Sequence, residues 1–314
     1  MAKKYIVGVD IGGTNIRAAL ITFNGEVVPD SKAKAATGKD PVTALHKLLE
    51  LVYAPHAKEI CGIGVAVAGV VDRENGIVLR SPNIPKLNGV QLSAEIGKWY
   101  KTTVAIENDA NAAAYGEKFS GVGKDIRNFV MLTLGTGIGG GVVIDDKLLP
   151  VAAEIGHMSI SAGAHQQCPC GNVGCLELYA SATAIIGTAI AEIEKGKNSL
   201  LKDFYHGNFY KIKAEDVYKA ALEGDTLARG VLRDAGKSLG VGIASVINIF
   251  SPDAVVLTGG LIGAWNIYVE AAIQEASKRA FKELYNRVKI IPSSLGDDAG
   301  MIGAANLILE KCKG

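Results

Sequence analysis

The sequence has no uninterrupted apolar run of about 18 residues, the length that a membrane-spanning helix needs. Its nearest approach, Phe129 to Ile144, is shorter and rich in glycine. It also lacks a strong charge of either sign, because 33 lysines and arginines face 32 aspartates and glutamates, a net charge of +1. Since there is neither an overall positive field nor a dense basic run, we expect no nucleic-acid partner and no membrane partner.

No secretory leader is evident, since Met1-Ala2-Lys3-Lys4 runs directly into the strand-like segment Tyr5–Val9. We therefore expect a cytoplasmic protein, in a compartment where structural disulfides are rare. Only five cysteines are present, and three of them lie within eight residues. In a reducing compartment such clustering favours a metal site over disulfides.

Glycine, in contrast, is abundant, with 38 of 314 residues against a usual share of ~7%. The apolar share of 48% is typical of a globular protein, and the length exceeds the roughly 100–200 residues of one domain. We expect a small α/β lobe of residues 1–118 plus 300–314, and a large α/β lobe of residues 119–299 that carries the cysteine-rich loop.

The hydrophobic pattern alternates between strand and helix along the chain. A strand, a glycine turn and a returning strand occur at Tyr5–Phe23 and again at Asn128–Asp145, which indicates an internal duplication. The fold class is therefore α/β, with two lobes and a cleft between them. Strands are expected over Tyr5–Asp10, Ile16–Phe23, Ile60–Val67, Thr103–Ile106, Asn128–Leu134, Gly141–Asp145, Ala254–Leu257 and Val288–Ile291, and helices over Pro41–Tyr53, Val90–Tyr100, Asn108–Lys118, Ala182–Lys195, Ala214–Leu222, Thr226–Phe250 and Ala299–Lys311.

Three tight glycine turns follow strands, and they span Asp10–Asn15, Gly135–Gly140 and Thr258–Gly260. Such a turn exposes a row of backbone N–H groups that binds phosphate, and only glycine lets a phosphate approach so closely. Taken singly, each turn is equally compatible with an ordinary hairpin. The G-x-G-x-x-G match in the second turn does not indicate a dinucleotide site, because a strand rather than a helix follows it. A P-loop motif is absent.

Asp10 stands at a strand end, just before the first turn. A carboxylate there repels phosphate unless a metal intervenes, so we expect Asp10 to order Mg²⁺ between the phosphates; its counterpart, Thr133, cannot do so. Together the three turns resemble the phosphate-1, phosphate-2 and adenosine motifs of the actin-like ATPase superfamily. The resemblance implies duplicated ribonuclease H-like lobes with ATP in the interdomain cleft. The implied ATP/Mg²⁺ contacts are Asp10, Gly12, Gly13, Thr14, Asn15, Thr133, Gly135, Thr136, Gly137, Gly259 and Gly260.

The segment Ile106–Ala114 passes from a strand into an alanine-rich helix and carries Asn108 and Asp109 at the junction. Asp109 is suited to be a helix cap, and it is equally suited to be a general base; the two roles are compatible. Phosphoryl transfer to an alcohol requires a carboxylate at the attacking oxygen. Asn108 offers both a donor and an acceptor to a sugar hydroxyl, and Asn83, in the stiff loop Pro82–Pro85, is a further candidate for sugar contact.

Three cysteines, Cys168, Cys170 and Cys175, follow His157 and complete a Cys₃His set, which is common at structural zinc sites. His165 is an alternative fourth ligand. Because four protein ligands leave no open position for a reactive water, we expect the zinc to fix the loop rather than to take part in chemistry. The competing interpretation is three unrelated reduced thiols.

Two carboxylates flank this loop. Glu154 precedes His157 by three residues, and Glu177 follows Cys175 by two. Each glutamate alone is typical of a solvated surface charge. A metal-pinned loop would hold both rigidly, however, and carboxylates are good acceptors for neighbouring sugar hydroxyls.

The segments Glu154-Ile155-Gly156-His157 and Cys168-x-Cys170-Gly171-x-x-Gly174-Cys175-x-Glu177 resemble the zinc motif of the ROK family of sugar kinases and repressors. The resemblance covers residues ~5 to ~310. It implies that Asp109 is the catalytic base, that Asn108, Asp109, Glu154, His157 and Glu177 contact the sugar, and that the zinc ligands are His157, Cys168, Cys170 and Cys175. A homodimer is also typical of the family.

The function implied is that of an ATP:hexose 6-phosphotransferase acting on the primary hydroxyl, with glucose as the first expectation. Fructose, mannose, allose or N-acetylmannosamine as acceptor, and polyphosphate as donor, remain open alternatives. Two other classes compete. A sugar-responsive repressor needs a helix-turn-helix before the first strand, for which we expect no room ahead of Tyr5, and a non-catalytic sugar-binding protein would not need both Asp10 and Asp109.

Overall fold

The computed structural model describes the backbone of residues 3–312 and the side chains of residues 3–309. The chain forms two compact units. The first contains the residues up to Asn128, Gly141–Ala152 and the residues from Ser293 on; the second contains Phe129–Gly140 and Ala153–Pro292. The first unit thus takes in residues 119–128, 141–152 and 293–299, which the expected lobe boundaries had assigned to the larger lobe. No helix among the described residues has the length and apolar character needed to cross a membrane.

The first unit is built on a five-stranded mixed sheet with the strand order β3-β2-β1-β4-β7. The two hairpin pairings, β1–β2 and β2–β3, are antiparallel, and β1–β4 and β4–β7 are parallel. The strands are β1 (Tyr5–Ile11), β2 (Asn15–Thr22), β3 (Ala33–Ala36), β4 (Ile60–Val67) and β7 (Thr103–Asn108), and the short hairpin of β5 (Val70–Asp72) and β6 (Ile77–Arg80) lies between β4 and β7 in the chain.

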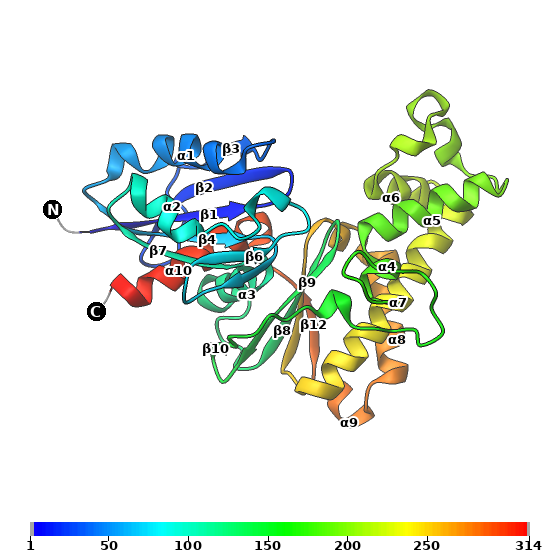
Figure 1. The fold of residues 1–314 in the computed structure, drawn as a ribbon. Coiled ribbons are helices and arrows are strands. Elements are labelled where there is room, and N and C mark those ends of the chain that lie inside the picture. The colour runs from blue at the N-terminus through cyan, green and yellow to red at the C-terminus, as the bar shows by residue number, and fades with distance from the viewer. Residues whose placement is uncertain (1–2, 313–314) are drawn as a thin grey trace. The chain divides into compact units, whose positions relative to one another are not determined.

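Helices cover both faces of this sheet (Figure 1). Because side chains alternate along a strand, Val7 and Val9 of β1 enter the core with α1 and α2, whereas Ile6 enters the core with α10. Helix α1 begins where the sequence predicts, since Asp40 caps it by accepting a hydrogen bond from the Thr43 N–H (3.1 Å) and Pro41 occupies its first turn. The helices of this unit are α1 (Pro41–Val52), α2 (Leu92–Trp99), α3 (Asp109–Ser120) and α10 (Ala299–Cys312).

Helix α10 lies directly on the backbone of the sheet and of α3. A side chain at Gly8 or Gly64 would strike the backbone of α10. Gly303 of α10 faces α3 in the same way, because a Cβ there would collide with the Ala112 carbonyl oxygen and lie 2.7 Å from the Gly116 nitrogen. The glycines of these elements therefore set the packing distance between layers.

We expect Gly303→Ala to lower the free energy of unfolding by about 1–3 kcal/mol or more, since the added methyl group has no space between α10 and α3. The matched control is Gly97→Ala in α2, where nothing lies within 4 Å of the added Cβ. That substitution should instead stabilise the protein by about 0.5–1 kcal/mol. Urea unfolding of both variants measures the two effects, and equal stability of the two variants would contradict this view of the packing.

The second sheet has the strand order β10-β9-β8-β11-β12. The pairs β8–β11 and β11–β12 are parallel, and β9–β10 is antiparallel. Strand β9 begins at Ile138, three residues before the expected start, so the preceding glycine turn is shorter than predicted. The strands are β8 (Phe129–Leu134), β9 (Ile138–Ile144), β10 (Lys147–Leu148), β11 (Ala254–Thr258) and β12 (Lys289–Pro292).

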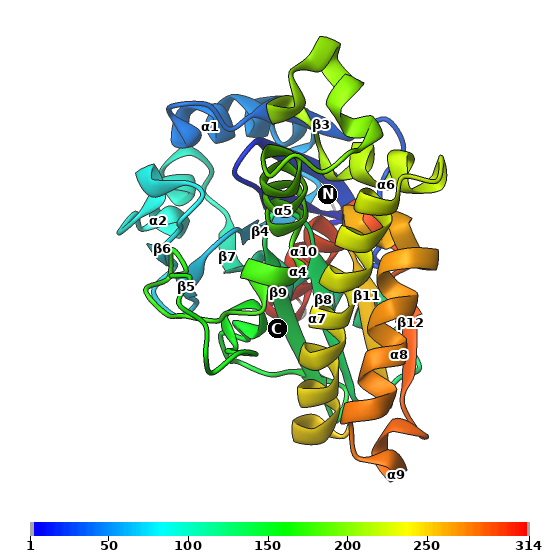
Figure 2. The same ribbon diagram turned by 90° about the vertical axis from the view of Figure 1, so that its right-hand side faces the viewer.

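Helices make up most of the rest of the second unit. The long helix α7 runs beside α8 (Figures 1 and 2), with Gly236 and Gly240 of α7 lying against the backbone at Tyr268 and Ala272. Helix α8 is not predicted by the hydrophobic pattern, because its buried positions are alanines rather than large apolar residues. The helices are α4 (Glu177–Ala180), α5 (Ala182–Glu194), α6 (Ala214–Leu222), α7 (Thr226–Phe250), α8 (Glu270–Arg279) and α9 (Lys282–Tyr285).

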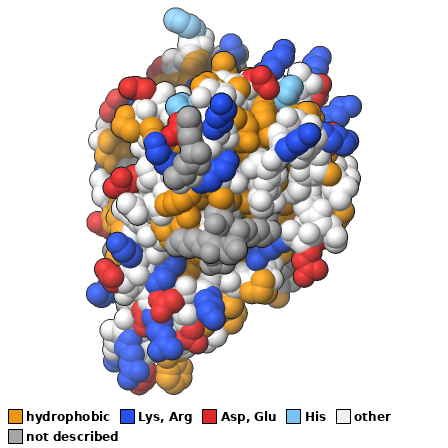
Figure 3. Space-filling view, turned by 90° about the vertical axis from the view of Figure 1, so that its left-hand side faces the viewer, with side chains coloured by type: hydrophobic (Ala, Val, Ile, Leu, Met, Phe, Trp, Pro, Cys, Tyr) orange, Lys and Arg blue, Asp and Glu red, His pale blue; other side chains and the backbone are white. Residues whose placement is uncertain are grey.

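Charges of both signs are interspersed on the face of the molecule shown in Figure 3, and no broad field of one sign covers it. This distribution agrees with the near-zero net charge of the sequence.

Candidate functional site

Asp10 lies near the end of β1, where burial raises the pKa of its carboxyl group to about 6. Arg17 opposes that shift and Asp297 reinforces it. Arg17 Nη1 and Asp297 Oδ2 form an ion pair of 3.0 Å. A Cβ built on Gly300, in the first turn of α10, would lie 3.5 Å from the Asp10 Cγ atom, so this carboxyl group faces the N-terminus of that helix.

We expect Asp10→Asn to stabilise the protein at neutral pH in the absence of Mg²⁺ and nucleotide. A carboxyl group whose pKa rises from 3.8 to about 6 on folding favours the native state below pH 4, and that advantage is lost as the pH rises through 6. The loss amounts to about 3 kcal/mol at about 1.4 kcal/mol per tenfold change in proton affinity, and asparagine does not incur it. Thermal unfolding at pH 5 and pH 8 should show a stabilisation that is larger at pH 8, and a difference independent of pH would contradict the argument.

The first glycine turn is closed by a hydrogen bond from the Gly12 N–H to the Asn15 carbonyl oxygen (3.0 Å). The hydroxyl of Thr37, the residue directly after β3, donates to the Gly12 carbonyl oxygen at 2.6 Å and supports the turn. Asn83 lies against this turn, since a Cβ on Gly13 would be 3.1 Å from the Asn83 Cβ atom. The structure thus brings the expected sugar residue Asn83 beside the expected phosphate turn.

Asn108 ends β7 and is the N-cap of α3, and Asp109 is the first residue of that helix. The Asn108 Oδ1 atom accepts from the backbone N–H groups of Ala110 and Asn111, both at 3.0 Å. Its Nδ2 donates to the Gly69 carbonyl oxygen at 2.9 Å. The residue that caps α3 is therefore Asn108 and not Asp109, as the sequence had suggested. One of the two N–H groups of the Asn108 side-chain amide remains to donate to a sugar hydroxyl.

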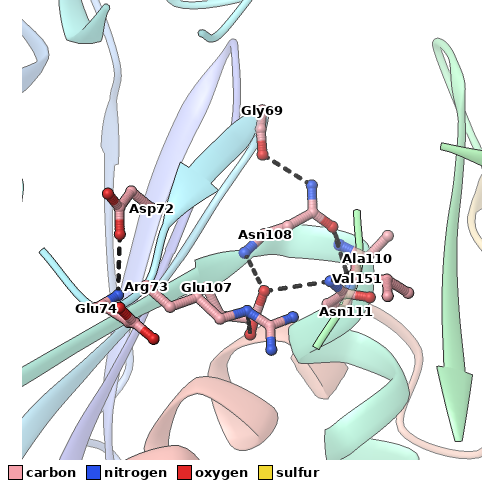
Figure 4. Close-up of polar contacts among 9 residues, drawn as sticks. All are labelled: Gly69, Asp72, Arg73, Glu74, Glu107, Asn108, Ala110, Asn111 and Val151. Atoms are coloured by element: carbon pink, nitrogen blue, oxygen red, sulfur yellow. Dashed lines mark hydrogen bonds and ion pairs between the residues drawn. The ribbon is translucent and has the colours of Figure 1, made fainter. Parts of the chain in front are cut away.

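Beneath these two residues lies a buried polar cluster that the sequence analysis did not identify. It contains Glu107 and Asn111, each with 1% of its surface exposed, and it is drawn in Figure 4. The signal in the sequence was Glu107, a charged residue directly after the apolar stretch Val104–Ile106 of β7.

The second glycine turn lies in the second unit and is held by two side chains. Thr133 Oγ1 accepts from the Gly139 N–H at 3.1 Å, and Glu177 Oε2 accepts from the Ile138 N–H at 2.8 Å. A Cβ at Gly137 would meet the Glu177 carboxylate, so a side chain there would displace Glu177 from the turn. Glu177, expected only as a sugar ligand, therefore also supports the turn.

The third turn meets the second at one edge of the sheet. Strands β8 and β11 are parallel neighbours in which Thr133 pairs with Thr258, so the turns that follow them lie side by side. Gly259 has a φ of +95°, and a Cβ there would strike the Leu134 carbonyl oxygen. Only glycine satisfies both conditions at this position.

The expected metal ligands come together in the second unit. One potential ligand atom from each of His157, Cys168, Cys170 and Cys175 lies within 4.8 Å of the other three. Cys168 Sγ is 3.6 Å from His157 Nδ1, and Cys170 Sγ is 3.7 Å from Cys175 Sγ. Tetrahedral zinc bonds of about 2.3 Å to sulfur and 2.0–2.1 Å to nitrogen give separations of about 3.6–3.8 Å, so the four residues fit this ion. The alternative ligand His165 is not part of the cluster among the described residues.

The environment of the three thiols differs. Burial and the neighbouring thiols raise the pKa of Cys175 to about 12, and burial also raises the pKa of Cys168. A backbone hydrogen bond from Asn172 lowers the pKa of Cys170. Because a metal binds thiolates, binding at this cluster would release protons.

The two ring nitrogens of His157 face different groups. Nδ1 points to Cys168, and Nε2 lies 3.9 Å from Glu154 Oε2. Glu154 is the N-cap and His157 the last residue of a short 3₁₀ turn (Ile155–His157), which explains how residues three apart share one side of the loop. This arrangement leaves one histidine nitrogen for a metal and directs the other toward a carboxylate.

Two α/β units, each built on a five-stranded mixed sheet whose strands are joined by glycine turns, define the actin-like ATPase fold. The model of the ROK family matches residues 6–311, and the chain belongs to that family.

Among its relatives, this chain is 33% identical to a glucokinase of Thermotoga maritima over the whole length of both proteins. It is 31% identical to a xylose repressor of Caldicellulosiruptor bescii, over 97% of this chain and 78% of the repressor. Its structure is similar to that of a ROK family glucokinase from Streptomyces griseus in complex with glucose and AMPPNP, with a TM-score of 0.84, 31% identity, and coverage of 96% of this chain and 98% of that one.

Proposed function

We propose that this protein is a sugar kinase that transfers the γ-phosphoryl group of ATP to the primary 6-hydroxyl of a hexose, with glucose as the first candidate. The observation that carries the proposal is the junction of β7 and α3, where Asp109 follows a residue that already caps the helix. Asp109 therefore stands in the first turn of the helix without being its N-cap, and its Oδ1 atom accepts from the Ala110 N–H at 2.9 Å, which holds the carboxylate at the junction. Similarity to glucokinases along the whole chain supports the same function.

In this proposal, Asp109 accepts the proton of the attacking hydroxyl while its oxygen approaches the γ-phosphorus in line. The bond between the γ-phosphorus and the bridging oxygen of ADP breaks, and the sugar leaves as its 6-phosphate. Asn108 donates its remaining amide N–H to a neighbouring sugar hydroxyl. The protein's main contribution is positioning, since phosphoryl transfer requires little covalent chemistry from the enzyme.

Nucleotide binding is assigned to the glycine turns. In this proposal the backbone N–H groups of Gly12–Asn15 and those of Gly135–Gly137 are phosphate contacts, and those of Gly259–Gly260 are nucleoside contacts. Asp10 would hold Mg²⁺, and the ion would supply positive charge beside the phosphates. Burial raises the pKa of Asp10 in the metal-free protein, and a bound cation would favour its ionised form.

Sugar recognition is assigned to Glu154, His157 and Glu177, with Asn83 as a further contact. Zinc at the Cys₃His cluster would hold the segment that carries these residues. The ion would act structurally, because the four protein ligands complete its coordination.

A panel of hexoses tested with ATP and with polyphosphate examines the proposal directly. We expect ADP release that depends on glucose and exceeds the release with fructose, mannose, allose and N-acetylmannosamine. Phosphorylation of another hexose, or use of polyphosphate, would change the substrate but retain the kinase. Sugar binding without phosphorylation of any hexose would favour a sugar-responsive regulator, a class represented among the relatives by the xylose repressor.

A homodimer and a cytoplasmic location remain predictions. Multi-angle light scattering of the purified protein measures the first, and we expect twice the mass of the 32.8 kDa chain.

A further inference from the structure

Glu107 is a buried carboxylate directly before Asn108 and Asp109. Only 1% of its side chain is exposed, and burial raises the pKa of this group, an effect that Arg73 opposes. Arg73 Nε lies 2.7 Å from Glu107 Oε2 (Figure 4). The Arg73 side chain is 30% exposed. A buried charge that has lost this partner is strongly destabilised, so the arginine is the group that allows a carboxylate at this position.

The second carboxylate oxygen of Glu107 holds residues on both sides of Asp109. Oε1 accepts from the backbone N–H of Asn108 at 2.8 Å and from Asn111 Nδ2 at 3.3 Å. Asn111 Nδ2 also donates to the Val151 carbonyl oxygen at 2.9 Å. The last residue of β7 and the first turn of α3 are therefore tied to the same carboxylate.

The orientation of the Asn111 side chain leaves one of its polar atoms without a hydrogen bond. Its Oδ1 atom is buried and has no hydrogen-bond partner among the described residues. Rotating the amide by 180° would bring this oxygen toward the two acceptors that Nδ2 now serves, the Glu107 carboxylate and the Val151 carbonyl. The surroundings thus fix Asn111 rather than adapt to it, as is typical of residues near functional sites.

Arg73 is presented by a rigid turn between β5 and β6. Asp72 Oδ1 accepts from the backbone N–H groups of Glu74 (3.1 Å) and Asn75 (3.0 Å), and Asp72 Oδ2 accepts from Asn75 Nδ2 (2.8 Å). Gly69, immediately before β5, accepts from Asn108 Nδ2. The hairpin therefore contacts the β7–α3 junction at two points, through Arg73 and through Gly69.

We propose that Arg73 and Glu107 are positioning residues that fix the orientation of Asp109. The inference rests on the proposed function, in which Asp109 accepts the proton of the sugar hydroxyl. Neither residue needs to touch substrate. The ion pair holds Asn108 and Asn111, the residues before and two after Asp109, so that the carboxylate meets the hydroxyl at a constant angle. Small displacements of a catalytic group lower the rate of the chemical step far more than they weaken binding.

The test compares Arg73→Ala with Arg80→Ala, because Arg80 is an exposed arginine on β6 of the same hairpin. We expect Arg73→Ala to lower kcat about tenfold or more with KM for the sugar changed less than about threefold, and Arg80→Ala to change neither. Since Arg73 is partly exposed, added ethylguanidinium should enter the space left by its side chain and restore kcat. Arg73→Lys, which keeps the charge but not the planar fork, should recover part of the loss.

Hydrogen exchange of the Asn108 backbone N–H, which donates to Glu107, gives a readout that does not depend on catalysis. We expect faster exchange of this amide in Arg73→Ala, slower exchange again with ethylguanidinium, and no change in Arg80→Ala. If wild-type protein phosphorylates no sugar, the proposed function fails, and the exchange measurement still decides whether the ion pair holds the junction. Unchanged kcat and exchange in Arg73→Ala would overturn the inference. A rise in KM alone, or a fall in kcat that ethylguanidinium does not reverse, would overturn it as well.

Discussion

Asp109→Asn should lower kcat by at least about 10²–10⁴-fold while sugar binding stays detectable. An asparagine of almost the same shape occupies the first position of α3 but cannot accept the proton of the attacking hydroxyl. Helix α3 should remain intact, because Asn108 supplies its cap. Initial rates of ADP release measure the loss of turnover, and calorimetric titration with glucose measures the retained binding.

Asp40→Asn is the matched control. Asp40 caps α1 in the same unit, accepting from the Thr43 N–H at 3.1 Å and from the Thr43 hydroxyl at 2.7 Å. Asparagine caps helices about as well as aspartate, so the same change of charge should leave both turnover and folding nearly unchanged. Asp109→Asn turnover within about tenfold of wild type would refute the assignment of Asp109 as the base.

Loss of the metal should have the second large effect. We expect about one equivalent of zinc per chain in the purified protein, in line with a four-coordinate site. Cys175→Ser should reduce this to less than about half an equivalent, lower Tm and weaken sugar affinity. Cys175 is fully buried and stands two residues before Glu177, whose carboxylate holds the Ile138 N–H. The cluster is therefore joined through a short piece of chain to the second glycine turn as well as to the proposed sugar ligands.

His165→Ala is the control for the metal site. His165 is exposed, lies in the same loop and offers the same ligand type, but it is not part of the described cluster. Zinc content, measured by atomic emission, and Tm should match the wild type in this variant and fall in His157→Ala. Loss of zinc from His165→Ala but not from His157→Ala would show that the fourth ligand is wrongly assigned.

Features that depend on residues close together in the sequence were predictable. The Cys₃His spacing indicated the metal cluster, and the cluster forms in the structure. Strand, glycine turn and strand were recognised at both positions, because glycine is needed where the backbone of another segment leaves little space for a Cβ, as at Gly140 beside the Ala153 carbonyl oxygen. The sequence favoured His157 over His165 as the fourth ligand, and the structure places His157 in the cluster.

Whether Asp109 caps α3 could not be predicted from the sequence. The N-cap is the residue that has non-helical backbone angles directly before the helix, and the sequence does not fix which residue that is. The structure assigns the cap to Asn108, whose ψ of 142° is extended, and leaves Asp109 inside the helix. Helix α8 was likewise hidden, since a helix that packs through alanine against glycines of α7 carries only a weak hydrophobic signal.

By itself, the sequence determined the α/β fold class, the positions of the glycine turns, the grouping of His157 with the three cysteines and the strand–helix junction that carries Asp109, because each of these is encoded by residue types at short spacing. Only the tertiary structure decided that Arg73 neutralises Glu107, that Asn83 lies on Gly13, and that Glu177 supports the turn at Ile138. These contacts join segments 34 to 70 residues apart. Their partners follow from strand order and packing, which no local pattern of residues specifies.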